Sequence, residues 1–187
     1  AAAVHAHNLS VIRLLHPIIA VARDGNGVLE NFGGECDGPK ESVVYLEADR
    51  ADARTRRALL SDIHRVLADV HAAVKDWPEL QRRMREDAGR VRPEEGKALL
   101  EWFADHHFTQ VGHFVQYAGE APRDVLGAFR NDGPPCWREP TSEAAFAHFE
   151  NGGSGPLLAK ADRLSTVHRR VPLDLVIAPI REGEKVV

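Results

Sequence analysis

Residues 11–27 read VIRLLHPIIAVARDGNG, and this stretch indicates the class of fold. Its first thirteen residues are rich in Val and Ile, which favour strands, and they end at Asp24-Gly25-Asn26-Gly27. This tetrapeptide contains an Asp-Gly and an Asn-Gly pair, both strong signals for a hairpin turn. We therefore expect a strand over 11–23 and a return strand from Val28. Because proline has no N–H to donate, the strand should lie at a sheet edge or bulge at Pro17.

A long helix is expected after a second strand, which we place at residues 42–48. From Leu59 to Trp77, apolar residues recur every three or four positions and form one stripe, as in an amphipathic helix. Asp52 is suited to cap its N-terminus. Pro78 suits the first turn of another helix, because a helix needs no N–H bond there.

The second half of the chain predicts shorter elements. Pro93 begins a third helix, whose buried side we assign to Leu99, Leu100, Trp102 and Phe103. The remaining expectations are a strand within 107–117, an irregular stretch at 119–140, a short helix capped by Thr141, and two closing strands at 156–161 and 171–179. This order predicts an α+β fold with antiparallel sheets packed against helices. The break before Pro93 predicts two domains, at 1–92 and 93–187.

Composition excludes several classes of protein. The 187 residues are 43% hydrophobic and 28% charged, which is typical of a globular chain. No run of 18 apolar residues and no signal peptide are found, so we expect no membrane span and a cytoplasmic location. The formal net charge of −4 argues against a nucleic-acid partner. Cys36 and Cys136 are too few for a disulfide framework or a zinc set.

Catalytic and metal-binding motifs are not evident. Gly25-Asn26-Gly27 lacks the later glycine and the following helix of a dinucleotide loop. The ten histidines are not accompanied by the three or four ligands that a zinc site requires, so we predict no metal. The cluster of Arg82, Arg83, Arg85, Arg90 and Arg92 could bind an anion. A solvated helix face is the favoured interpretation, because acidic residues lie between them.

Ser165, His168 and Asp174 combine the three residue types of a hydrolase triad. A triad is defined by geometry, and no G-x-S-x-G nucleophile motif is present. We favour structural roles for these residues and keep a small hydrolase as an alternative hypothesis.

Four stretches of the chain are informative when they are taken together. They are Leu15-His16-Pro17-Ile18 with Arg23-Asp24 and Gly27; Glu41-Ser42 with Glu47-Ala48-Asp49-Arg50; Asp105-His106-His107-Phe108-Thr109 with Gly112; and Lys160-Ala161 with Arg163 to Arg169 and Asp174. In this order and spacing they resemble one family, the N-terminal region of the large NAD-dependent glutamate dehydrogenases. The resemblance runs from about Leu9 to Ile180, and its most specific part is residues 165–169 (STVHR).

The resemblance implies a parent enzyme several times longer, which oxidatively deaminates L-glutamate to 2-oxoglutarate with NAD. It implies ACT-like and other α+β regulatory modules in this region, with the NAD-binding and glutamate-binding residues downstream. We therefore expect no catalytic, cofactor-binding or metal residue here, and structural roles for the family-motif residues. These are His16, Pro17, Asp105, Phe108, Gly112, Ser165, Thr166, His168, Arg169 and Asp174. His168 and Arg169 are expected in a buried, hydrogen-bonded turn.

The chain also departs from the family pattern. The family has an aromatic residue where Gln110 stands and a tyrosine where His113 stands. An ACT-like, ferredoxin-like module would have a strand and a helix before Leu9, and we expect both to be absent. The chain would then be a fragment or a truncated relative with an incomplete first unit.

The expected partners follow from this interpretation. They are other domains and subunits of the parent enzyme, a small-molecule effector, and a second copy of the chain, because an incomplete sheet leaves an edge for pairing. A stand-alone amino-acid-binding module is the alternative.

Overall fold

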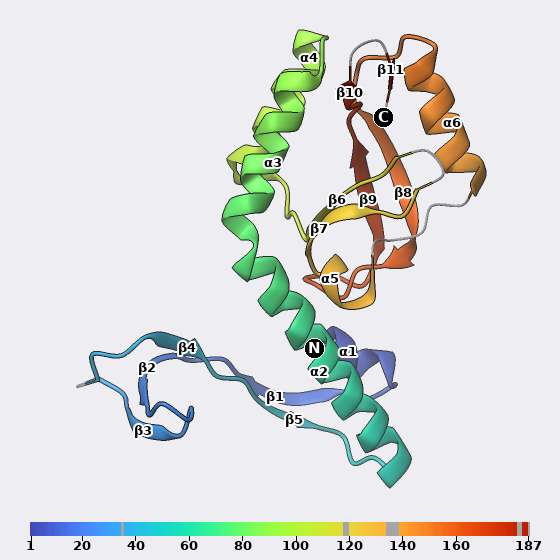
Figure 1. Cartoon of the computed structure of the whole chain (residues 1–187). Helices are drawn as coiled ribbons and strands as arrows, with labels where there is room; N and C mark the ends of the chain where they lie inside the picture. The colour runs from blue at the N-terminus through green and yellow to red at the C-terminus, as the bar shows by residue number, and fades with distance from the viewer. Residues whose placement is uncertain (35, 118–119, 134–138, 183–184, 187) are drawn as a thin grey trace. The chain divides into compact units, whose positions relative to one another are not determined.

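The computed structural model describes residues 1–187 except 35, 118–119, 134–138, 183–184 and 187 (Figure 1). The side chains of 139–141, 181–182 and 185–186 are also outside the description. The chain divides into two compact units, Ala1–Ile63 and His64–Val187. The division between the units falls at Ile63, within one long helix. The domain boundary expected after residue 92 stays a prediction.

The first unit consists of a short helix, small antiparallel sheets and the first part of the long helix. Strand β1 pairs with β5, and β2 lies between β3 and β4. The helix α1 precedes Leu9, so the expectation that this segment contains no helix is wrong. The elements are α1 (Ala2–Ala6), β1 (Val11–Leu15), β2 (Ile18–Arg23), β3 (Leu29–Phe32), β4 (Lys40–Ser42) and β5 (Tyr45–Ala48).

Pro17 divides the strand that was expected to be continuous over 11–23. The segments on either side, β1 and β2, belong to different sheets. Pro17 has no N–H for a ladder, and its carbonyl instead accepts a hydrogen bond from the N–H of Val43 at 3.0 Å. The predicted hairpin is confirmed, because β2 and β3 pair across the turn and Asp24 Oδ1 accepts the N–H of Val28 at 2.8 Å.

The helices begin where capping chemistry predicts. Helix α2 (Ala53–Lys75) follows Asp52, whose Oδ1 accepts the N–H of Thr55 at 2.7 Å. Helix α3 (Trp77–Arg90) has proline in its first turn, and α4 (Glu94–Trp102) follows Pro93. A wide turn, η1 (Phe103–His107), ends the helical region.

Burial along the helices differs from the expected apolar stripe. In α2 the buried residues are Asp69 and Ala73, whereas Leu60, Leu67 and Val74 are more than half exposed. In α4 Leu100 is fully buried. The predicted burial of Trp102 is wrong, because its ring stacks on the imidazole of His107, with centroids 4.6 Å apart, and remains half exposed.

Over its described residues, the second unit adds three antiparallel strand pairs and two helices to the helical region. The helix near residue 141 is confirmed, but the predicted cap is wrong, because α6 begins at Glu139 and Thr141 lies within it. The closing strand pair is confirmed. The stretch 119–140 was expected to be irregular, and it contains β7 and α5; its residues 134–138 lie outside the described part. The elements are β6 (Gly112–Val115), β7 (Arg123–Gly127), α5 (Phe129–Asp132), α6 (Glu139–Glu150), β8 (Leu157–Leu164), β9 (Pro172–Ile177), β10 (Arg181–Glu182) and β11 (Lys185–Val186).

The core of the second unit joins α3, α4 and the end of β9. Ala88, Val91 and Leu100 are buried together, and four partly buried side chains pack against them: Met84, Phe103, Val176 and Ala178. All described strand pairs are antiparallel, so the α+β fold class is confirmed. Over the residues described, none of the helices has both the length and the apolar character that crossing a membrane requires.

Candidate ligand-binding cavity

A cavity of about 330 Å³ lies within the second unit. Residues of α3, β6, α6 and β9 and of the segment 165–171 line it. Most of its wall is apolar and includes Leu80, Met84, Phe129, Phe146, Phe149 and Leu175. Concave, mainly apolar cavities of this size with a few polar groups are typical of small-molecule sites.

Close packing around Gly112 shapes one wall. A Cβ atom at this position would lie 2.6 Å from Cδ2 of Phe129, so a larger residue would push the ring away. Phe114, on the same strand, meets Phe129 edge to face, with centroids 5.9 Å apart. Phe108 packs against Phe103, with centroids 4.7 Å apart. Gly112 and Phe108, both family-motif residues, are therefore wall residues of the cavity.

Two polar wall residues contain buried atoms without a hydrogen-bond partner among the described residues. They are Gln110, through Oε1, and His113, through Nδ1. Gln110 is only 7% exposed. An unsatisfied buried polar atom costs about 1–3 kcal/mol, so this wall would gain stability from a bound polar group.

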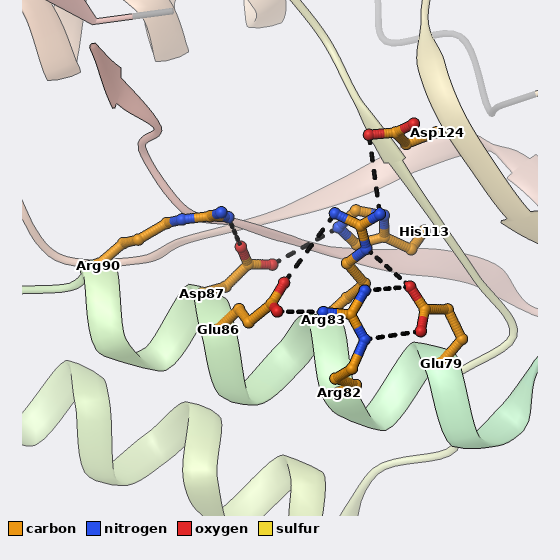
Figure 2. Close-up of polar contacts among 8 residues, drawn as sticks. All are labelled: Glu79, Arg82, Arg83, Glu86, Asp87, Arg90, His113 and Asp124. Atoms are coloured by element: carbon orange, nitrogen blue, oxygen red, sulfur yellow. Dashed lines mark hydrogen bonds and ion pairs between the residues drawn. The ribbon is translucent and has the colours of Figure 1, made fainter.

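The other ring nitrogen of His113 faces an acidic group on α3. Its Nε2 lies 3.6 Å from Oδ2 of Asp87, while Oδ1 of Asp87 accepts a hydrogen bond from Arg90 Nη1 at 2.7 Å (Figure 2). In the neutral ring, a proton on Nε2 facing the carboxylate leaves Nδ1 as an acceptor. The cavity wall thus contains one buried acceptor on Gln110 and, in that tautomer of the ring, a second on His113.

The outer face of α3 is a network of ion pairs. Arg82 and Arg83 both contact Glu79 and Glu86, and Arg83 also lies 3.8 Å from Asp124 (Figure 2). Hydrogen bonds from Arg82 are the main reason that the pKa of Glu79 falls to about 2. These pairings support the predicted solvated helix face over an anion site.

Residues 165–169 form a tight turn at the cavity. Ser165 Oγ donates a hydrogen bond to the carbonyl of Val167 at 2.7 Å. Thr166 Oγ1 donates to Oδ2 of Asp69 at 2.6 Å. The expected turn is present, but the expected burial of His168 and Arg169 is wrong: both are exposed, since the turn directs its hydroxyl side chains inward. His168 has the left-handed φ of +68°.

Two carboxylates anchor this part of the unit. Asp69, which is 3% exposed, also accepts a hydrogen bond from Asn131 Nδ2 at 2.8 Å. Asp76 Oδ2 accepts from the N–H of Gly127 at 2.8 Å and from Arg130 Nε at 2.5 Å. The Arg130 hydrogen bond is the main cause of a lowered Asp76 pKa. Sequence reasoning identified neither role.

The structure does not join Ser165, His168 and Asp174 into a relay. The hydroxyl of Ser165 donates its hydrogen bond to the Val167 carbonyl. Asp174 Oδ1 lies 2.5 Å from Lys160 Nζ, in an exposed ion pair between β8 and β9. Between these three described side chains no hydrogen bond is present. The hydrolase hypothesis therefore has no geometric support.

The remaining motif residues are not among those that line the cavity. His16 hydrogen-bonds Ser42 next to Pro17 in the first unit, and Asp105 Oδ1 is 3.7 Å from Arg85 Nη2. Within the described ranges, no three His, Cys, Asp or Glu residues gather as a metal site would require. Cys36 is a free thiol, and Cys136 lies outside the described residues.

A dinucleotide does not fit the glycine turn of this chain. Gly25 and Gly27 lie between two strands of a hairpin, whereas a phosphate-binding turn leads from a strand into a helix N-terminus. We therefore derive no step involving NAD from these residues.

Comparison with known proteins identifies part of the chain. Residues 1–63 match the glutamate dehydrogenase ACT1 domain. An NAD-specific glutamate dehydrogenase from Pseudomonas aeruginosa is 34% identical over 56% of this chain, and the matched region is 7% of that protein's length. No solved structure matches. The resemblance identified from the sequence is confirmed: residues 1–63 match the glutamate dehydrogenase ACT1 domain, and the chain is similar to part of an NAD-specific glutamate dehydrogenase.

Proposed function

We propose that this chain is a non-catalytic regulatory region of a larger NAD-dependent glutamate dehydrogenase. The observation that carries the proposal is the match of residues 1–63 to the ACT1 domain. The parent enzyme would convert L-glutamate and NAD to 2-oxoglutarate, ammonium and NADH, with both substrates bound by other parts of the protein. The structural use of Ser165 and Asp174 supports a role without chemistry.

The physical role would be allosteric: binding of a ligand or of a neighbouring subunit to this region would change the affinity of a distant active site. Such coupling is typically worth about 1–3 kcal/mol, or 5- to 150-fold in affinity. The partners would be other domains of the parent and further copies of it in a cytoplasmic oligomer. The cavity in the second unit supplies a place where a small molecule would exert this effect.

A free-standing binding module is the second candidate, and the cavity favours it equally. The reading frame on both sides of the 187 codons distinguishes a regulatory region from a free-standing module. A frame that continues into a dinucleotide-binding domain supports the regulatory region. Stop codons that bound the chain closely would overturn it in favour of the free-standing module.

A direct assay tests the absence of catalysis. The purified 187-residue chain is incubated with L-glutamate and NAD, and NADH is followed by its absorbance. We expect no NADH above a blank without protein. Glutamate-dependent NADH formation that co-purifies with the chain would overturn the proposal.

A further inference from the structure

We propose that the cavity of the second unit binds a small aromatic carboxylate: its ring among the phenylalanines, a hydroxyl or N–H on the buried acceptors, and its carboxylate on Arg169. This inference deepens the proposed function, because it names the chemical class of the effector. Binding can be measured without any dehydrogenase activity, so its failure is distinguishable from failure of the proposed function.

The apolar wall selects the body of the ligand. Five phenylalanines line the cavity: Phe108, Phe114, Phe129, Phe146 and Phe149. Aromatic pairs prefer offset or edge-to-face arrangements, which the contact of Phe114 with Phe129 already shows. A flat ring that enters among these side chains would bury its faces and edges against rings, so the wall favours an aromatic over a polar body.

The buried acceptors select a donor on the ligand. Gln110 Oε1 and His113 Nδ1 have no partner among the described residues, although both residues line the cavity. An O–H or N–H group carried by the ligand would supply the missing hydrogen bond after a small side-chain rotation. Since a ligand without this donor leaves the acceptors unsatisfied, the wall discriminates between hydroxylated and plain rings.

The charge at the cavity selects an anion. Four wall residues other than His113 carry or can carry a charge: Asp87, His168, Arg169 and Asp174. Asp87 is paired with Arg90, and Asp174 with Lys160. Neither His168 nor Arg169 has a side-chain partner among the described residues, and Arg169 is exposed. The unbalanced charge of the wall is therefore positive, and a guanidinium binds a carboxylate through two parallel hydrogen bonds.

The turn holds Arg169 at the cavity. Thr166 ties the segment to Asp69, and Ser165 closes it on Val167. Two backbone hydrogen bonds at 3.0 Å, from Arg169 N–H to the Val167 carbonyl and from Val171 N–H to the Arg169 carbonyl, fix the guanidinium-bearing residue itself. Because the backbone is already ordered, binding pays little entropy there.

Calorimetric titration of the purified chain with 3-(4-hydroxyphenyl)propanoate tests the proposal. We expect saturable binding, with weaker binding of 3-phenylpropanoate, which lacks the hydroxyl, and none of 4-hydroxyphenethylamine, which is a cation. Arg169→Ala should weaken binding of the carboxylate about tenfold or more. Arg170→Ala is the matched control: the neighbouring arginine is exposed and is not among the wall residues, so affinity should not change.

Gln110→Leu separates the hydroxyl contact from the rest. It should lower affinity for the hydroxylated probe and leave that for 3-phenylpropanoate unchanged, while circular dichroism confirms that the variant is folded. Absence of binding by both carboxylates would overturn the proposal. So would equal binding of the amine, or affinity that does not depend on Arg169.

Discussion

The hydroxyl of Thr166 donates a hydrogen bond to the buried carboxylate of Asp69, 2.6 Å away and 97 positions earlier in the sequence. The same carboxylate accepts a hydrogen bond from Asn131. The side chain of Asp69, on α2, thereby holds both the turn at residues 165–169 and the helix α5. The segment 165–169 is thus attached to the part of α2 that belongs to the second unit.

Replacing Asp69 should destabilise the second unit. Asp69→Ala leaves the donors of Thr166 and Asn131 without their acceptor, so we expect the free energy of unfolding to fall by about 2–3 kcal/mol. Thr166→Val removes one of the two bonds and should cost about 1 kcal/mol. Urea unfolding followed by tryptophan fluorescence measures both.

Asp162→Ala is the control for this comparison, because Asp162 is an exposed carboxylate on β8. Its stability should stay close to that of the parent chain. If Asp69→Ala is as stable as Asp162→Ala, the anchoring role of Asp69 is refuted.

Asp76 predicts a dependence of stability on acid pH. Its pKa is lowered from 3.8, chiefly by the hydrogen bond from Arg130 and further by the N–H of Gly127. A folded-state pKa below the unfolded value contributes stability that is complete above pH 3.8 and is lost as the pH falls through the folded pKa. Asp76→Asn lacks this contribution.

Urea unfolding at a series of pH values measures the gap in stability between the parent chain and Asp76→Asn. The gap should be constant between pH 5 and 7 and should narrow below about pH 3.8. A gap that stays constant or widens on acidification would contradict the assigned contacts.

Local patterns predicted most element boundaries. Asp52 and Pro93 mark helix starts, Asp24 and its glycines mark a hairpin, and each depends on bonds within a few residues. The resulting elements lie close to their expected ranges. β7 was missed because Arg123 and Asp124 give it a polar start and because Asp124 has a left-handed φ of +49°.

The buried face of the helical region could not be read from hydrophobicity. Asp69, Ala73, Asp76 and Leu80 follow one another at intervals of four, three and four residues. Asp76 is partly buried and the other three are buried, although two of the four are acids. The two acids accept hydrogen bonds from donors far along the chain, such as Thr166 and Gly127. The cavity was missed for the same reason: its wall collects residues of four helices, of β6 and β9 and of the segment 165–171, which only the fold brings together.

The low pKa of Glu79 should be measurable by NMR titration of its carboxyl group. Its carboxylate accepts two hydrogen bonds from Arg82, through Nε and Nη2, and one from Arg83, and its pKa is about 2. In Arg82→Gln, the main cause is removed and the pKa should rise toward 4.5. Carboxyl carbon chemical shifts followed against pH measure both values.

High salt should also raise the Glu79 pKa, because this pair is exposed and is screened by ions. Arg85→Gln is the control: Arg85 lies on the same helix but pairs with Asp105. If the pKa of Glu79 is the same in Arg82→Gln as in the parent chain, the two residues do not interact.

Gly127 occupies a position that only glycine can fill. Its φ is +66°, and a Cβ atom there would lie 2.3 Å from the carbonyl oxygen of Val111, the residue directly before β6, with which β7 pairs. Gly127→Ala therefore combines left-handed strain of about 1–2 kcal/mol with a backbone collision, and β6 and β7 must separate. We expect a loss of at least 3 kcal/mol of stability, measured by urea unfolding.

Gly152→Ala separates the cost of left-handed strain from the cost of the backbone collision. Gly152 has a φ of +94°, but a Cβ atom there would meet nothing within 4 Å, so only the conformational strain remains. Its loss of stability should be about 1–2 kcal/mol. Equal losses in the two variants would mean that the β6–β7 pair tolerates the added methyl group, and the close approach at Val111 would then be wrong.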